Sequence, residues 1–381
     1  MRIGIEAQRL FRSNKFGVEI VALELIRGLQ KIDKENEYFI FVKKDSDRTG
    51  IVETGNFKIV SIPRSPYPYW EQFVLPRYVK KYKIDLLHCT ANTAPVRVGG
   101  IPVVLTLHDI IFRESAILKG SAYQVFGNYY RRFLLPFIIG KNRTLITVSD
   151  YERNKILAAL KIAPEKIHTI HNAVSSAFRL IDDQGIKEAI REKYRLPAEF
   201  ILYFGNTAPK KNMKRMLEAF ALYCNQLGEK ALPMVMTDPS GGKYTEQLLH
   251  QIGRSDILPR LVLVQHVAYQ DLPVVYNLST TFVYPSLRES FGLPLLEAMA
   301  CGTPVIASNT SSIPEIGGDA AWLVNPEQSD EIAGAMVALI HNAGKLAAYR
   351  AKGLERAAVF TWENTAGKVL SLYKEILRLK N

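Results

Sequence analysis

Two glutamates, Glu289 and Glu297, lie eight residues apart in the segment LRESFGLPLLEAMACGTPVIAS, residues 287–308. Pro294 between them predicts the first turn of a helix, where the N–H group that proline lacks would have no partner. Free N–H groups at such a helix start bind an anion, aided by the helix dipole. Gly292, just before the helix, lets that anion approach the backbone. The segment therefore predicts an anion site flanked by two carboxylates.

The two acids can serve different parts of one ligand. Glu297, about one turn into the expected helix, is suited to accept two hydrogen bonds from a vicinal diol such as a ribose. Glu289 lies in the loop on the other side of the anion, so a diphosphate with a sugar at each end fits the layout. The alternative is that Glu297 is a first-turn acid favoured by the dipole and Glu289 a solvated loop charge. Spacing alone leaves both interpretations open.

The elements that must position these residues alternate along the chain as short strands and helical stretches. This alternation is typical of parallel sheets covered by helices on both faces. The first expected set of strands is RIGIEA, YFIFV, FKIVSI, IDLLHC, PVVLTLH and TLITVS, and the second is FILYFG, PMVMT, LVLV, TFVYPS, PVIAS and AWLV. The segment HTIHNAV, residues 168–174, is a further strand or the hinge between the sets.

The chain has 381 residues, which is long for a single hydrophobic core, so two domains are expected. We place them at residues 1–172 and 199–361, joined by a polar linker at 173–198. An amphipathic helix at 362–381 follows, and we expect it to cross back to the first domain. The fold class is α/β, with two doubly wound parallel-sheet domains facing a cleft. Such sheets bind ligands at the carboxyl ends of their strands, so chemistry is expected in the cleft.

Positive charge is concentrated in the first half of the chain. Up to residue 170 there are 27 Lys and Arg against 16 Asp and Glu, whereas the remaining residues hold 22 against 21. A basic half attracts an anionic lipid, a nucleic acid or a phosphorylated substrate through its long-range field. Because no helix-turn-helix, zinc-finger or aromatic ribonucleoprotein motif accompanies the charge, we expect no nucleic-acid partner.

Cysteine usage and the apolar segments bear on the compartment. Cys89, Cys224 and Cys301 are too few and too scattered for a disulfide framework or a zinc site, so we expect a reducing cytosol and no metal site. The start of the chain reads as a strand and not as a signal peptide. The apolar run FLLPFII, residues 133–139, is too short to span a bilayer. We expect a cytoplasmic protein that is at most peripheral at the inner face of the plasma membrane.

The segments ESFGLPLLE and AMACGTPVIAS resemble the E-x7-E signature of retaining glycosyltransferases with the GT-B fold. This large family includes sucrose synthases and many bacterial mannosyl- and glucosyltransferases. Further segments are similar to family blocks in family order, namely KFGVEIVALELIRGL, LTLHD, ITVSDYERNKI, LYFGNTAPKKNMKRMLEAF and SSIPEIGGDAAWLVNP. The resemblance implies two Rossmann-like domains, the first taking the acceptor and the second the nucleotide sugar. It also implies transfer of a sugar from a nucleoside diphosphate with retained anomeric configuration.

Carried over to this sequence, the family pattern gives the two glutamates different roles. Glu297 would bind the ribose hydroxyls of the nucleotide, and Glu289 would hold hydroxyls of the donor sugar. The backbone of Phe291, Gly292 and Leu293 would face the sugar and phosphates.

The resemblance also implies a cation on the diphosphate. Lys211 matches the basic residue of the family, and Lys210 beside it is the less favoured of the two. Neutralising charge on the leaving nucleotide is the main demand of this reaction, and a lysine meets it without a metal. Many relatives have Arg soon after the strand glycine, whereas this chain has Asn206 after Gly205, so a second cation is missing or comes from elsewhere, with Arg215 a weak candidate. Asn206 can still donate a hydrogen bond to a phosphate oxygen.

In the first half, Gly17 matches the glycine that lets the backbone approach the diphosphate. His108 matches the histidine that hydrogen-bonds the donor sugar as a neutral imidazole. The alternative for His108 is a core histidine bonded to a backbone carbonyl, and Asp109 is expected to orient it or to cap the following turn. Asp45 and Asp47 spell the D-x-D of metal-using sugar transferases, but they lie in a charged loop, and we discount them.

The basic first half is expected to face its acceptor and a membrane. Residues 129–143 interleave Arg and Lys with aromatic and aliphatic side chains, as in a segment that lies on an anionic membrane, or as in a buried helix with basic ends. Tyr67, Tyr69 and Trp70 are expected to add an aromatic wall to the acceptor site.

The resemblance favours a hexosyltransferase that takes mannose from GDP-mannose and adds it to a glycolipid or growing surface oligosaccharide, with no cofactor beyond the donor. UDP- and TDP-sugars stay open as donors. A nucleotide-sugar epimerase or hydrolase of the same fold is the nearest alternative. The alternative from another class is a non-catalytic lipid- or nucleic-acid-binding protein of this fold.

Overall fold

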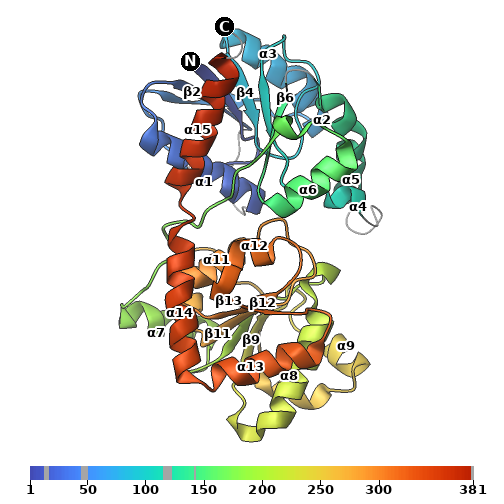
Figure 1. Cartoon of the computed structure of the whole chain (residues 1–381), viewed down its shortest axis with the longest axis vertical. Helices are drawn as coiled ribbons and strands as arrows, with labels where there is room; N and C mark the ends of the chain where they lie inside the picture. Colours follow the sequence, from blue (N-terminus) through green and yellow to red (C-terminus); the bar gives the residue numbers. More distant parts are fainter. Residues whose placement is uncertain (13–16, 44–49, 115–121, 141–142, 379–381) are drawn as a thin grey trace. The chain divides into compact units, whose positions relative to one another are not determined.

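The computed structural model describes residues 1–12, 17–43, 50–114, 122–140 and 143–378. The chain divides into two compact units (Figure 1). The first comprises Met1–Asn172 together with Trp362–Asn381, and the second comprises Ala173–Thr361. Each unit has its own sheet and its own hydrophobic core.

The first unit is built on a seven-stranded parallel sheet with the strand order β3-β2-β1-β4-β5-β6-β7. Its strands are β1 Arg2–Glu6, β2 Glu37–Lys43, β3 Phe57–Ile62, β4 Leu86–Cys89, β5 Val103–Thr106, β6 Arg143–Thr147 and β7 Ile167–Thr169. Its helices are α1 Gly17–Ile32, α2 Tyr67–Tyr69, the π-helical turn η1 Trp70–Val74, α3 Leu75–Lys81, α4 Ile111–Glu114, α5 Ala122–Ile138, α6 Asp150–Leu160 and α15 Trp362–Arg378. The strands are nearly continuous apolar runs because helices cover both faces of a parallel sheet.

The last helix, α15, packs against α1 within the first unit (Figure 1). Gly28 lets the two helices approach closely, because an added Cβ would lie 2.8 Å from the carbonyl oxygen of Trp362. At the other end, the Tyr373 hydroxyl lies 2.5 Å from Nδ1 of His88 on β4. Burial lowers the pKa of His88 to about 3, so this imidazole stays neutral and serves the packing of α15.

The second unit has a six-stranded parallel sheet with the order β10-β9-β8-β11-β12-β13. Its strands are β8 Ile201–Tyr203, β9 Met234–Thr237, β10 Leu261–Val264, β11 Thr281–Tyr284, β12 Val305–Ser308 and β13 Ala321–Val324. Its α-helices are α7 Gln184–Tyr194, α8 Met213–Leu227, α9 Lys243–Gln251, α10 Leu272–Leu278, α11 Leu293–Ala300, α12 Ile313–Gly317, α13 Ser329–Ile340 and α14 Ala343–Ala358.

The polar stretch 173–198, expected as a linker, is part of the second unit and contributes α7. The side chain of Asp183 caps this helix by accepting from the amide of Ile186 at 3.0 Å. Tyr194 at its end donates to Asp271 at 2.7 Å. A surface helix with one buried residue, Ile190, has the composition of a linker, which is why the sequence suggested one.

Both sheets have the same doubly wound order, in which the chain starts in the middle, runs to one edge and then continues from the middle to the other edge. The expectation of two doubly wound, Rossmann-like domains is confirmed. The order reverses between β1 and β4 in the first sheet and between β8 and β11 in the second. Ligands bind outside the carboxyl ends of the strands at such a switch point.

Candidate functional site

The switch point of the second sheet is formed by the loops that follow β8 and β11. Lys210 and Lys211 lie in a short 3-10 turn after β8. The Tyr203 hydroxyl donates to the carbonyl of Lys211 at 2.7 Å, and the amide of Leu287 donates to the carbonyl of Lys210 at 2.8 Å. These bonds tie the lysine turn to β8 and to the loop after β11.

Glu289 is the centre of an ion-pair cluster in this place. Lys211 Nζ lies 2.8 Å from Glu289 Oε1, and Lys210 Nζ lies 3.7 Å from Oε2. Burial alone would raise the pKa of Glu289, but the two lysines outweigh it and hold the pKa below its ordinary value. The carboxylate is therefore ionised. Lys211, which is more buried than Lys210, also lies 5.0 Å from the centre of the Tyr284 ring.

The backbone around Glu289 is held from both sides. Its amide donates to Ser311 Oγ at 3.1 Å, and its carbonyl accepts from Ser312 Oγ at 3.0 Å. Gly292 follows in the left-handed region with φ of 97°, and an added Cβ would lie 2.8 Å from Cδ1 of Ile313. Only glycine satisfies both constraints.

The helix α11 starts at Leu293, directly after the glycine and with Pro294 in its first turn, as the sequence predicts. Phe291 before it is buried and packs edge-on against Phe360, with the ring centres 6.0 Å apart. The side chain of Phe291 is therefore occupied by packing. What this segment can offer a ligand is the backbone at the start of α11, and its contact with the sugar or phosphates stays a prediction.

Glu297, the fifth residue of α11, has a different environment from Glu289. It is buried, and the Tyr276 hydroxyl donates to its Oε2 at 3.3 Å. Phe178 and Phe204 pack against the same tyrosine ring. Burial raises the pKa of Glu297 to about 7. Among the described Lys and Arg residues, none pairs with it. This acid can therefore accept further hydrogen bonds, and the hydroxyls of a ribose as their donors stay a prediction.

The residues Gly205 and Asn206 shape the loop after β8. A Cβ at Gly205 would lie 2.8 Å from the carbonyl oxygen of Thr237, so the glycine is required by packing. Asn206 Oδ1 accepts from the amide of Ala208 at 2.8 Å and closes a turn. Arg215, on the helix that follows the lysine turn, donates to Asn212 Oδ1 at 3.3 Å. A phosphate contact by Asn206 or Arg215 stays a prediction.

In the first unit, His108 is buried directly after β5. Its Nε2 lies 2.9 Å from the carbonyl oxygen of Thr90, which makes Nε2 the donor. Burial lowers the pKa of His108, so the ring is neutral with Nδ1 as an acceptor. The backbone-carbonyl contact is the one expected of a core histidine, and a sugar contact stays a prediction. Asp109 accepts from the amide of Ile111 at 3.1 Å and so caps the following turn.

Gly17 is the first residue of α1, and an added Cβ would meet no described atom within 4 Å. Residues 13–16 before it lie outside the described part of the chain, so its contact with a diphosphate stays a prediction. The D-x-D residues Asp45 and Asp47 also lie outside the described residues.

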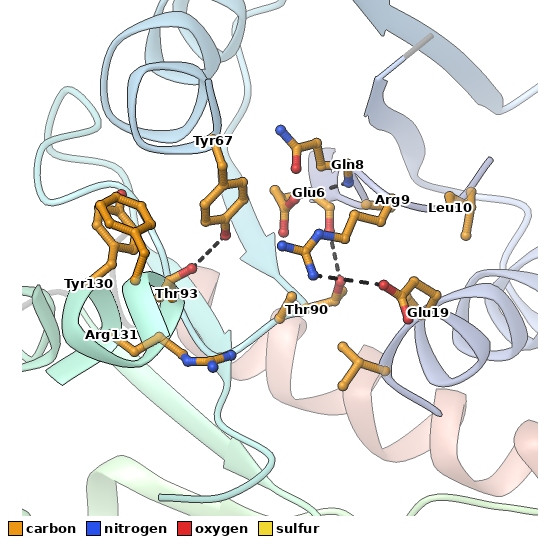
Figure 2. A pocket seen from close by; sticks show the side chains of 16 residues that line it. Glu6, Gln8, Arg9, Leu10, Glu19, Tyr67, Thr90, Thr93, Tyr130 and Arg131 are labelled. Carbon is orange, nitrogen blue, oxygen red and sulfur yellow. Dashed lines mark hydrogen bonds and ion pairs between the residues drawn. The ribbon is translucent and has the colours of Figure 1, made fainter. Parts of the chain in front are cut away.

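The switch point of the first sheet holds a cavity of about 260 Å³ (Figure 2). Glu6 at the end of β1 and Thr90 after β4 lie at its base, and Tyr67 forms part of its wall. Of the residues expected in the aromatic wall of the acceptor site, Tyr67 lines this cavity, and its contact with an acceptor stays a prediction. The expectation is wrong for Trp70, which lies fully in the core, and for Tyr69, which is exposed. Glu6 was not predicted, although an acid that ends an apolar strand is a signal for it.

Each half of the chain matches a known protein family. Residues 17–178 match the family described as "Glycosyltransferase Family 4". Residues 186–356 match the family described as "Glycosyl transferases group 1".

Two curated relatives are mannosyltransferases from Escherichia coli. The chain is 31% identical to O-antigen chain mannosyltransferase B over 234 residues. The aligned region covers 61% of this chain and 60% of that protein. It is 28% identical to the serotype-specific mannosyltransferase WbdA over 299 residues, and this aligned region covers 76% of this chain and 36% of WbdA. The matched region thus spans less than two thirds of either relative.

A similar solved structure is HepE from Anabaena in complex with UDP and glucose. The two chains have a TM-score of 0.74 at 18% identity, and the match covers 98% of this chain and 100% of HepE. The likeness concerns the fold. Together with the two family matches, which extend over nearly the whole sequence, it identifies this chain as a member of the GT-B glycosyltransferases.

Proposed function

We propose that the chain is a retaining, metal-independent hexosyltransferase that moves mannose from GDP-mannose to a lipid-linked or surface-polysaccharide acceptor. The observation that carries the proposal is the pair of lysines held against a buried glutamate beside the start of α11. Lysines and helix N–H groups at one point neutralise the charge of a leaving nucleoside diphosphate. The names of the two curated relatives support mannose as the sugar and a surface polysaccharide as the product.

In this proposal Lys211 and Lys210 bind the diphosphate, and Glu289 holds hydroxyls of the donor sugar. Glu297 accepts from the ribose hydroxyls, which replaces the cost of an unpaired buried acid by two hydrogen bonds. His108 uses its free acceptor Nδ1 on a sugar hydroxyl. Retention follows from attack by the acceptor on the face that the nucleotide leaves, without a covalent intermediate on the protein.

The first test is a thermal-shift screen with GDP, UDP and TDP and with their sugars. A ligand that binds only the folded state raises the melting temperature, and we expect the largest rise with GDP and GDP-mannose. Glu297→Ala should reduce the shift by the nucleotide itself. Glu289→Ala should keep it and lower turnover. A protein that none of these nucleotides stabilises would contradict the proposal.

The runner-up is the same reaction with a UDP-sugar. It is supported by the likeness to HepE, which was solved with UDP and glucose, although that likeness extends only to the fold. The same screen separates the two, because a UDP-using enzyme gives the larger shift with UDP.

We further propose that the first unit binds an anionic membrane through α5. Among the described helices, none is long and apolar enough to cross a bilayer. Phe126, Tyr129, Phe133 and Phe137 recur every three or four residues on α5, and each is more than half exposed. The helix sequence contains no Asp or Glu, and Arg132 is exposed beside the aromatic rings. Aromatic rings in the interface with a basic residue beside them fit an anionic lipid surface.

Flotation with vesicles of phosphatidylglycerol and phosphatidylcholine tests this surface. We expect Phe133→Ser with Phe137→Ser to release most of the protein, and Arg132→Glu to release part of it in a salt-dependent manner. Val359→Ser, an exposed apolar residue of the second unit, is the control. Flotation of all three variants as well as wild type would refute the membrane surface.

A further inference from the structure

The cavity of the first unit is small. Its volume of about 260 Å³ is at or below the lower end of the roughly 300–1,000 Å³ usual for small-molecule sites. It has room for one monosaccharide unit and not for a nucleotide sugar. Parts of α1 and α5, together with the loops after β1 and β4, enclose it (Figure 2).

Glu6 lines this cavity with one oxygen that has no described partner. The residue is 2% exposed, and its Oε1 accepts from the amide of Gln8 at 3.0 Å. Oε2 is buried without a hydrogen-bond partner among the described residues. A buried unpaired carboxylate oxygen is costly and calls for a donor. Burial, followed by the charge of Glu71, raises the pKa of Glu6 to about 7, as expected for an acid with an empty acceptor position.

Glu71 is fully bonded and fixes the wall of the cavity. Its Oε1 accepts from Tyr67 at 2.7 Å and from Thr93 at 2.5 Å. Its Oε2 accepts from Tyr130 at 2.7 Å and from Gln72 at 2.8 Å. Figure 2 shows Tyr67 and Thr93 joined on one side of the cavity, with Tyr130 beside them. The wall is thus built in advance of any ligand.

The charges of the cavity disfavour an anion. Glu6 interacts unfavourably with Glu71, and a phosphate would add a third negative charge. Two arginines, Arg9 and Arg131, also line the cavity, and each already has a partner, which for Arg9 is the lining residue Glu19. Arg9 lies 3.9 Å from Glu19, and Arg131 donates to Asn128 at 2.7 Å. The open acceptor Oε2 of Glu6 and an aromatic wall are what remains for a ligand.

We propose that this cavity binds an uncharged, hydroxyl-bearing sugar unit, and that Glu6 selects it by accepting a hydrogen bond from one hydroxyl at Oε2. The proposal rests on the proposed function, in which the sugar unit is the end of the acceptor. Phe126 lies both on the rim of the cavity and on the exposed stripe of α5. A lipid-linked acceptor can therefore keep its lipid at the membrane while its terminal sugar enters the cavity.

Ligand-observed NMR titration tests the selectivity with a panel of methyl glycosides of mannose, glucose and galactose, and with mannose 6-phosphate. We expect at least one neutral glycoside to bind and mannose 6-phosphate to bind at least tenfold more weakly. Glu6→Gln should raise the dissociation constant of that glycoside about 10- to 100-fold, because a bond to a charged acceptor is lost. Binding of none of the glycosides, or equal binding of the phosphate, overturns the proposal.

A second variant keeps the test decisive if Glu6→Gln does not fold. Gly127 on α5 lines the cavity, and Gly127→Leu should fill it and abolish glycoside binding. Gly334→Leu, at an exposed glycine within α13 whose Cβ would meet nothing, is the matched control. Unchanged glycoside binding by Gly127→Leu also overturns the proposal.

The two proposals fail in distinguishable ways. Each variant is assayed in parallel for the thermal shift by GDP. If GDP raises the melting temperature but no glycoside binds, the proposed role of Glu6 is refuted and the proposed donor site is not. Absence of any nucleotide shift in the wild type removes the proposed function itself.

Discussion

The two units place their candidate sites at the same position of the same topology, yet the two sites have opposite chemistry. At the switch point of the second sheet, Lys210 and Lys211 surround Glu289 beside a helix start, which suits an anion. At the switch point of the first sheet, the buried acid Glu6 lines a cavity together with the aromatic residues Tyr67 and Tyr130, and we propose a neutral sugar unit as its ligand. The fold determines where a ligand binds, and the side chains after each strand determine which ligand it is.

The buried acids sharpen this difference. The pKa of Glu289 is held low because two lysines outweigh its burial, whereas burial raises the pKa values of Glu6 and Glu297 to about 7. Glu289 has strong partners within the described part of the protein, whereas Glu6 and Glu297 have none there. Buried acids without a strong partner destabilise the ligand-free protein and are typical of functional sites.

The largest effect is expected from Lys211→Ala. It removes the closer diphosphate cation and leaves Glu289 without its 2.8 Å partner. We expect kcat/KM for the donor to fall by about 10²- to 10³-fold, as for the loss of one preorganised charge stabiliser. Steady-state kinetics measure it, with Lys214→Ala as the control, because Lys214 is exposed and lies 4.0 Å from Glu218. Equal losses in both variants would show that the effect is not local to the site.

Glu297→Gln is expected to stabilise the ligand-free protein above pH 7. The folded pKa of about 7 exceeds the ordinary 4.5, so the ionised form is penalised only in the folded state. Ionisation of Glu297 lowers the free energy of unfolding of the wild type progressively as the pH rises from 4.5 to 7. Above pH 7 the loss amounts to at most about 3 kcal/mol. Urea unfolding at pH 5 and pH 8 measures it. A variant less stable than wild type at pH 8 would contradict the assignment.

Glycine substitutions extend the comparison to the backbone. Gly292→Ala must keep a φ of 97° and meets Ile313, whereas Gly17→Ala meets no described atom and has no such φ. We expect Gly292→Ala to lower the free energy of unfolding by about 1–3 kcal/mol and Gly17→Ala to leave it nearly unchanged. Equal urea midpoints for the two variants would remove the argument for a fixed anion loop.

The fold was largely predictable because its determinants are local. Buried parallel strands read as apolar runs, and a proline after a glycine marked the start of α11. The segment 173–198 was wrongly predicted to be a linker because the polar face of a surface helix has the composition of a linker.

The contacts that make each site were not predictable from local pattern. The pair of Lys211 and Glu289 joins residues 78 positions apart. The environment of Glu6 depends on Glu71, which is distant in the sequence and which the folded chain brings near it.

We propose that the nucleoside diphosphate binds at the switch point of the second sheet. Hydrogen–deuterium exchange with and without saturating GDP tests it most directly. We expect slower exchange at residues 287–297 and 208–212, and no change at residues 6–10 and 90–93. Protection at the first pair of segments and not at the second would support the division of roles between the two units, and protection confined to residues 6–10 and 90–93 would contradict it.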